Sequence, residues 1–165
     1  TEILVYKLYN LLTPVCLKSS LFKVTFAYSL NKVKSQTQFC MLRENEDKAA
    51  RRNENVIKKE QKVPAARLTP EEFRRVALFE YMIGNTDWSV PYLHNILLAF
   101  KDSSFVPTAI PYDFDHAGIV SAPYAMPPEQ LELTSVRDVL YIGYCQNIGD
   151  FESHFAGFNK LTEAL

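Results

Sequence analysis

The chain has 165 residues, 47% of them hydrophobic and 13% aromatic, which is enough for one packed core and too little for two domains of ordinary size. Its formal net charge of −1 gives no electrostatic reason to expect nucleic acid or an anionic membrane as a partner. No apolar run approaches the roughly 18 to 20 residues of a membrane-spanning helix, so we expect a single domain, residues 1–165, with no membrane span.

The N-terminal quarter predicts a helix followed by a β-hairpin. Residues 1–12, "TEILVYKLYNLL", form the expected helix, which ends near Thr13 because Pro14 disfavours helix before it and cannot continue the hydrogen-bond ladder. Apolar residues alternate in "LFKVTFAYS", and "QTQFCMLRE" is a second candidate strand after a polar turn around Asn31 and Lys32. Because the chain opens without Met on a helix already under way, we expect a missing upstream N-terminal segment.

A charged segment without aromatic residues follows the predicted hairpin. Residues 43–62 read "RENEDKAARRNENVIKKEQK", which predicts a solvated helix or a mobile connection. We therefore divide the chain into an N-terminal part (residues 1–43), a charged connection (44–68) and a larger C-terminal part (69–165).

The best-defined element in the sequence is the helix encoded by "LTPEEFRRVALFEYMIG". Thr69 is the expected N-cap, Pro70 fits the first helical position and Glu72 is the capping-box acid. Gly84 is suited to end the helix in the left-handed conformation. Asp87 is therefore predicted to lie in a loop that is anchored by a core helix.

Two short strands, "NILLAF" and "PTAIPYDF", are expected after this loop, with a polar turn between them. Asn95 opens the first strand, and Asp113 closes the second. This order predicts that Asp87, Asn95 and Asp113 meet at one edge of a hairpin. Two further helices, near residues 135–145 and 150–161, are expected to complete an α+β fold.

These oxygen-bearing side chains suit phosphoryl transfer. That reaction needs a carboxylate to orient or deprotonate the attacking hydroxyl, and hard oxygen ligands to hold Mg²⁺ against the triphosphate. Asp87 suits the first role, whereas Asn95 and Asp113 suit the second. Asp115 follows Asp113 closely, and two neighbouring like charges repel unless a cation or hydrogen-bond donors compensate them, so we expect at least one of the pair to be a metal ligand.

The segments "IGNTDWSVPYLHNILLAF" and "IPYDFDHAG" resemble the catalytic and metal-binding segments of atypical protein kinases of the CotH (spore-coat) type, and more distantly of HipA-like kinases. The resemblance is confined mainly to residues 69–120. It implies a protein-kinase-like fold with a mostly helical C-terminal lobe and a partial N-terminal lobe. It further implies ATP and Mg²⁺ (or Mn²⁺) as cofactors and a protein Ser/Thr hydroxyl as the substrate.

The same resemblance assigns roles to individual residues. Asp87 is the catalytic residue, Asn95 and Asp113 are metal ligands, and Asp115 is a possible second carboxylate ligand. The N-terminal helix takes the position of the kinase C-helix, in which Glu2 is the acid of the nucleotide-binding ion pair.

The sequence also departs from the usual kinase pattern. Asn95 follows Asp87 by eight positions, which is longer than in the H-R-D-x-x-x-x-N motif, and all five glycines lie at or after position 84. No Gly-rich loop and no lysine-bearing strand therefore precede the first helix. We expect the chain to be inactive without the upstream segment.

Several alternatives stay open at this point. His94 and His116 flank the expected site, and each either contacts a phosphate or metal or makes a structural hydrogen bond. The D-x-D pattern at residues 113–115 also occurs in phosphohydrolases of the haloacid-dehalogenase type and in metal-dependent glycosyltransferases, but both need alternating helices and parallel strands. A third alternative is a non-catalytic pseudokinase or binding module.

Overall fold

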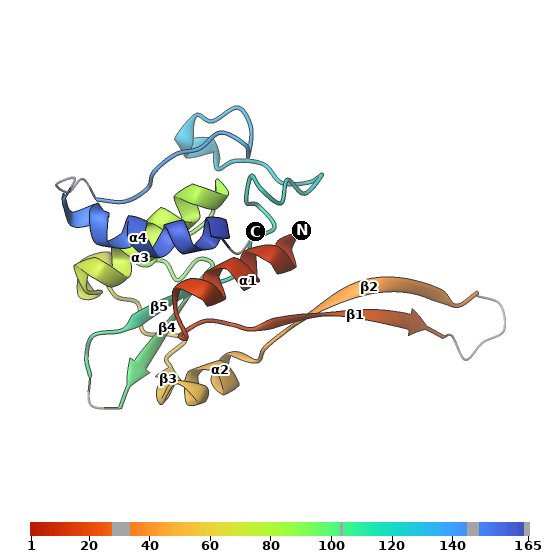
Figure 1. The fold of residues 1–165 in the computed structure, drawn as a ribbon, viewed down its shortest axis with the longest axis horizontal. Coiled ribbons are helices and arrows are strands. Elements are labelled where there is room, and N and C mark those ends of the chain that lie inside the picture. The colour runs from red at the N-terminus through yellow and green to blue at the C-terminus, as the bar shows by residue number, and fades with distance from the viewer. Residues whose placement is uncertain (28–33, 103, 145–148, 164–165) are drawn as a thin grey trace.

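The computed structural model describes all residues except 28–33, 103, 145–148 and 164–165. The described residues form four α-helices and five strands, and the strands make two separate antiparallel sheets (Figure 1). The predicted α+β class is confirmed at this level. Every helix in the described ranges is too short or too polar to cross a membrane.

The larger sheet lies at the centre of the body. It consists of β3 (Asn55–Ile57), β4 (Ile96–Lys101) and β5 (Thr108–Pro111), in that order. β4 pairs antiparallel with both neighbours, with Phe100 opposite Val56 and Leu98 opposite Ala109. β4 is almost fully buried, as expected for the central strand between two partners. The strand pair predicted from "NILLAF" and "PTAIPYDF" is confirmed.

Helix α3 (Pro70–Ile83) begins and ends as its sequence predicts. The Thr69 hydroxyl accepts a hydrogen bond from the Glu72 amide at 3.2 Å, and Pro70 occupies the first helical position. The predicted capping-box role of Glu72 is wrong, because its Oε1 pairs with Arg75 and its Oε2 has no hydrogen-bond partner among the described residues. At the other end Gly84 adopts a left-handed φ of 66°, and its amide donates to carbonyls of the last helical turn. These terminal interactions fix where the loop after the helix starts.

Helix α1 (Glu2–Leu12) ends before Thr13, as predicted, and buries one side of its surface. Tyr9 of α1 packs edge-on against Phe79 of α3, with 4.7 Å between ring centroids. The N-terminal helix therefore shares one hydrophobic core with α3 and the central sheet. The buried members of this core are Val5, Tyr6, Leu8, Tyr9, Cys16, Leu17, Ala49, Phe79, Ile83, Leu97, Ala99, Ile110, Phe114 and Ala117.

The second sheet is a hairpin that projects from the body as an arm (Figure 1). β1 (Ser19–Phe26) pairs along its whole length with β2 (Gln36–Arg43). Both predicted strands are confirmed, whereas the predicted turn at Asn31 and Lys32 lies outside the described residues.

The charged segment holds more regular structure than a solvated helix or a connection. The predicted helix is present as α2 (Glu46–Arg52), and it is followed by strand β3, which the sequence did not predict. Asn45 caps α2 through its side-chain oxygen, which accepts from the Lys48 amide. Val56 and Ile57 are the only residues with β propensity in the segment, and pairing with β4 is what makes this short stretch a strand.

The prediction of a helix at residues 135–145 is wrong. Residues 135–144 contain turns and no helix, because the Asp138 carboxylate accepts the amides of Thr134 and Ser135 and so stabilises a turn. The second helix is confirmed as α4 (Gly149–Glu163), whose His154 side chain hydrogen-bonds the Glu71 carbonyl at the start of α3.

Candidate functional site

The loop that carries Asp87 is fixed by a buried network beneath it. Glu80, on α3, is buried, and its Oε2 accepts a hydrogen bond from the Asn85 side chain at 2.9 Å. The Asn85 Oδ1 in turn accepts from the Asp87 amide at 3.0 Å. Trp88 is buried against Phe73. The backbone on both sides of Asp87 is thus anchored to α3, while the Asp87 side chain remains one-quarter exposed.

The Asp87 carboxylate is held by two side chains that return from the end of the loop. The His94 Nε2 lies 2.7 Å from Oδ1, and the Asn95 Nδ2 donates to Oδ2 at 3.0 Å. A β-bridge between Ser89 and His94 closes the loop and brings His94 and the adjacent Asn95 next to Asp87. The Asn95 Nδ2 also donates to the Asp87 carbonyl at 2.8 Å. The amide oxygen of Asn95, the atom through which an asparagine can bind a metal, takes part in neither bond.

Asp113 reaches the same edge through the pairing of β4 with β5. The Tyr112 amide donates to the Asn95 carbonyl at 3.0 Å and extends the ladder by one pair beyond the strands. Asn95 and Asp113 both have left-handed backbone, with φ of 53° and 61°, a region that Asn and Asp adopt more readily than most residues. The Tyr6 hydroxyl accepts from the Asp113 amide at 3.0 Å, so α1 supports this conformation.

The next two residues anchor the segment and return it to the surface. The Phe114 ring is buried in the core, edge-on to Tyr6 at 4.9 Å, and its amide donates to the Glu2 carboxylate at 3.4 Å. Asp115 Oδ2 accepts from the Tyr124 hydroxyl at 3.0 Å. The sequence Asp-Phe-Asp therefore buries its central ring and leaves one carboxylate on each side of it.

Negative charge accumulates at this edge. Partial burial raises the pKa of Asp113 above its ordinary value, and the charges of Asp115 and Asp87 raise it further, against an opposing effect of Arg43. Burial also raises the pKa of Glu2, although the Phe114 amide opposes the shift. Several carboxylates in a half-buried region with one compensating guanidinium favour the binding of a cation.

The structure thus brings together most of the residues that the sequence singled out. Asp87, His94 and Asn95 form one hydrogen-bonded network, and Asp113 lies beside it. His116 donates instead from Nδ1 to the Met126 carbonyl at 3.1 Å, and its charge opposes the rise that burial causes in the pKa of Asp113. Glu2 lies at the same edge as Asp113, where it binds backbone rather than a lysine.

The arrangement is suited to a metal that is shared with a substrate. Among the residues that the structure describes, no group of three or more His, Cys, Asp or Glu side chains is placed to hold a metal ion by itself. Mg²⁺ is usually bound through one or two carboxylates together with substrate phosphates and water. The oxygens of Asn95 and Asp113 fit that sparse donor set.

Three supporting residues were missed at the sequence level. Glu80 could have been found, because it is an acid inside the apolar run "ALFEYMIG", where a buried charge needs a partner. Nothing in the sequence around Tyr6 or Arg43 indicated that either residue supports the site. The Arg43 guanidinium lies 4.9 Å from the ring centroid of Tyr112, a contact made by elements far apart in the sequence.

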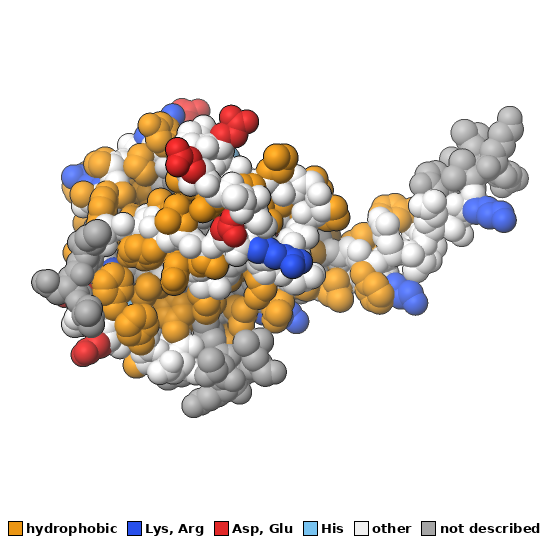
Figure 2. Space-filling view, turned by 90° about the horizontal axis from the view of Figure 1, so that it is seen from above, with side chains coloured by type: hydrophobic (Ala, Val, Ile, Leu, Met, Phe, Trp, Pro, Cys, Tyr) orange, Lys and Arg blue, Asp and Glu red, His pale blue; other side chains and the backbone are white. Residues whose placement is uncertain are grey.

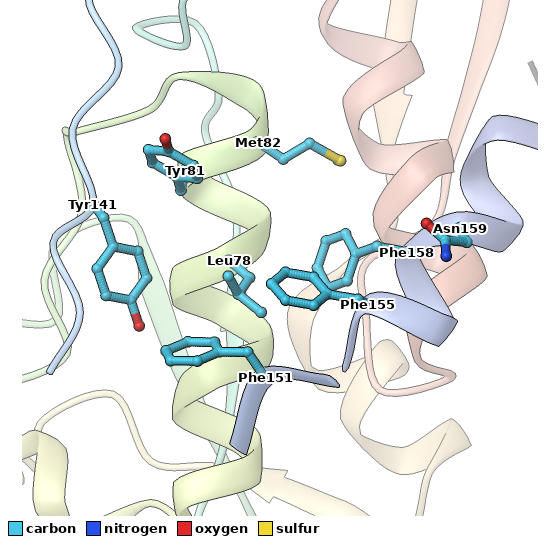
Figure 3. Close-up of a pocket in the computed structure, with 8 residues that line it drawn as sticks. All are labelled: Leu78, Tyr81, Met82, Tyr141, Phe151, Phe155, Phe158 and Asn159. Atoms are coloured by element: carbon cyan, nitrogen blue, oxygen red, sulfur yellow. The ribbon is translucent and has the colours of Figure 1, made fainter. Parts of the chain in front are cut away.

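A large apolar pocket lies away from these residues. It has a volume of about 520 Å³ and is formed between α3 and α4 (Figure 3). None of the candidate site residues contributes to it. Its lining residues are Leu78, Tyr81, Met82, Tyr141, Phe151, Phe155, Phe158 and Asn159.

Comparison of the chain with known protein families, with curated proteins and with solved structures gives no significant match. The functional interpretation therefore depends on the chemistry and geometry of the edge that Asp87, Asn95 and Asp113 share.

Proposed function

We propose that this chain is part of a kinase-like phosphotransferase that uses Mg-ATP to phosphorylate a protein Ser/Thr hydroxyl. The observation that carries the proposal is the position of Asn95. Its side chain donates to the Asp87 carboxylate at 3.0 Å, and its carbonyl accepts from the amide of Tyr112, the residue before Asp113. One residue thus links the catalytic carboxylate to the metal-binding edge.

Asp87 is the group that orients the attacking hydroxyl and accepts its proton. Its backbone is fixed by Asn85, and its two carboxylate oxygens are held by His94 and Asn95. Positioning accounts for most of the catalysis that phosphoryl transfer asks of a protein. Because the side chain is one-quarter exposed, an incoming hydroxyl can reach it.

Asn95 and Asp113 are the proposed ligands of Mg²⁺, and Asp115 is a further carboxylate available beside them. When bound, the ion neutralises charge on the triphosphate. Desolvation and the neighbouring carboxylates raise the pKa of the exposed Asp113, so this carboxylate gains more from a nearby cation than an isolated surface aspartate does. Left-handed backbone at both ligand positions agrees with the tendency of such conformations to cluster at ligand sites.

The strand arrangement favours this proposal over the other D-x-D enzymes. Phosphohydrolases and glycosyltransferases that use this pattern place it after a strand of a parallel sheet, whereas both sheets in the described residues are antiparallel. A kinase also needs a phosphate-covering loop and a nucleotide-binding lysine, and residues 1–165 hold no glycine before position 84 for such a loop.

Transfer of radiolabelled phosphate from Mg-ATP to casein tests the proposal. The assay uses the full-length protein that contains residues 1–165. We expect this protein to transfer phosphate, and we expect Asp87→Asn to reduce the transfer by on the order of 10²- to 10⁴-fold, the usual contribution of a general base. Asp102→Asn, an exposed aspartate after β4, is the matched control and should leave transfer unchanged.

Two outcomes contradict the proposal. Equal and small effects of Asp87→Asn and Asp102→Asn would remove Asp87 from the chemistry. A chain that binds Mg-ATP without transferring phosphate to casein or to itself would instead be a non-catalytic nucleotide-binding module.

A further inference from the structure

The β1–β2 arm exposes large apolar side chains along most of its length. Phe39 is 69% exposed and Leu42 is 58% exposed, and Leu21, Phe22 and Phe26 are exposed as well. An isolated two-stranded hairpin is at best marginally stable in water, and it needs further strands or a packed face to persist. The arm therefore carries apolar surface that the described part of the body does not cover.

The register shows that this surface lies on both faces of the arm. Residues alternate between faces along a strand, and Lys23 is opposite Phe39 whereas Ser20 is opposite Leu42. Leu21 and Phe39 thus lie on one face, and Phe22, Phe26 and Leu42 lie on the other. An antiparallel pair usually keeps one polar face for solvent. An arm without such a face is suited to be enclosed by a partner.

The outer edges of the arm are equally open. β1 and β2 form a two-stranded sheet, so within the described residues each strand pairs on one side only. Each strand has eight residues, "SSLFKVTF" and "QTQFCMLR", and neither contains a proline. Long edge strands without proline present rows of backbone donors and acceptors to another strand. The missing partner is therefore one that offers an extended backbone.

The charge of the arm indicates the chemistry of that partner. The chain has 19 acidic residues, yet residues 19–43 contain no Asp or Glu and carry Lys23, Lys32, Lys34 and Arg43. Lys23 and Lys34 are exposed. Figure 2 shows the arm with hydrophobic and basic side chains and no acidic ones on the visible face of its described residues. A partner that complements this surface is acidic.

We propose that the β1–β2 arm binds an extended acidic segment of another protein, which pairs as an additional strand with an outer edge and covers exposed apolar side chains. Main-chain hydrogen bonds supply affinity in this mode of recognition, and alternate side chains supply specificity. A lipid surface or a nucleic acid satisfies the basic charge but provides no strand backbone for the open edges. The inference is independent of the proposed phosphotransferase activity.

Selection from a phage library of random 12-residue peptides, with the folded chain as bait, tests the proposal. We expect enrichment of peptides in which Asp or Glu alternates with apolar residues. A fluorescein-labelled enriched peptide is then titrated against the wild-type chain and its variants. Hydrogen exchange should show that the peptide protects amides of β1 or β2 and leaves those of β4 unchanged.

Two pairs of variants separate the arm from the rest of the surface. Lys23→Glu should weaken peptide binding by about tenfold, which corresponds to about 1.4 kcal/mol, whereas Lys101→Glu, at an exposed position on β4, should leave it unchanged. Phe39→Ser should weaken binding to a similar extent. Phe105→Ser, where the phenyl ring is 78% exposed, is its control.

Three results overturn the proposal. The first is a selection without acidic enrichment, and the second is equal affinity of the enriched peptide for Lys23→Glu and Lys101→Glu. The third is an arm that is covered by a different partner. A second copy of the chain would appear in sedimentation as a dimer that Phe39→Ser dissociates, and a lipid surface would appear as binding to phosphatidylserine vesicles without peptide binding.

Discussion

Glu80→Gln is expected to change how the stability of the protein depends on pH. Glu80 is only 1% exposed, and burial raises its pKa from 4.5 to about 8, against the opposing hydrogen bond from Asn85 and with a smaller raising effect of Asp87. The folded state therefore holds this proton more tightly than the unfolded state does. Glutamine keeps an oxygen that accepts from Asn85 and has no proton to lose.

The sign and size of the effect follow from the two pKa values. Below pH 4.5 the carboxyl is protonated in both states, and its contribution to stability is fully present. That contribution is lost as the pH rises towards 8, because the unfolded chain releases its proton readily and the folded chain does not. A difference of 3.5 units between 4.5 and about 8 corresponds to about 5 kcal/mol at 1.36 kcal/mol per unit, which is comparable to the whole stability of a small domain.

Urea unfolding followed by the fluorescence of Trp88, the single and buried tryptophan, measures this effect. Wild type and Glu80→Gln should be similarly stable at pH 5, and the variant should be more stable by several kcal/mol at pH 9. Glu71→Gln is the matched control, because Glu71 lies on the same helix with a side chain that is 69% exposed. Parallel pH profiles of wild type and Glu80→Gln would refute the reasoning.

Three further substitutions test the packing and the helix ends by the same unfolding assay. Thr69→Ala should cost about 1 kcal/mol because it removes the cap that accepts from the Glu72 amide, and Thr69→Ser should recover most of it. Gly118→Ala should cost about 1–3 kcal/mol, because its Cβ would lie 2.6 Å from the Val136 carbonyl oxygen, and an unchanged midpoint would contradict that close approach. Phe79→Ala should cost about 3–5 kcal/mol, since the ring is fully buried, and a loss below 1 kcal/mol would mean that the core closes around it.

Elements with strong local signals were predictable from the sequence. Helix α3 has a proline at its first position, a threonine cap and a terminal glycine, so its bounds depend on residues within or next to it. In β1 the apolar residues Phe22, Val24 and Phe26 alternate with polar ones, and β4 is a largely apolar run. In each case the local chemistry and the tertiary environment favour the same conformation.

Elements that depend on distant partners were not predictable. β3 has three residues, and its pairing with β4 supplies the hydrogen bonds that its own charged neighbourhood does not suggest. The predicted helix at residues 135–145 had apolar periodicity, yet the Asp138 side chain competes for the amides of Thr134 and Ser135 and stabilises turns instead.

The sequence predicted that Asp87, Asn95 and Asp113 lie at one edge, and it did not predict the residues and contacts that support them. The order of Asp87, Asn95 and Asp113 along the chain suggested one shared edge, and the structure places all three there. The contacts of Tyr6 with the Asp113 amide and of Glu2 with the Phe114 amide span 107 and 112 positions of sequence. Such contacts arise only when α1 packs against the sheet.

Calorimetric titration with Mg-ATP tests the central claim most directly. The titration compares the wild-type full-length protein that contains residues 1–165 with its Asp113→Asn, Asp87→Asn and Asp102→Asn variants. The account predicts that Asp113→Asn weakens magnesium-dependent binding, while Asp87→Asn and Asp102→Asn retain it. Unchanged magnesium-dependent affinity in Asp113→Asn, or the absence of Mg-ATP binding by the wild-type chain, would contradict the assignment of this edge as a nucleotide and metal site.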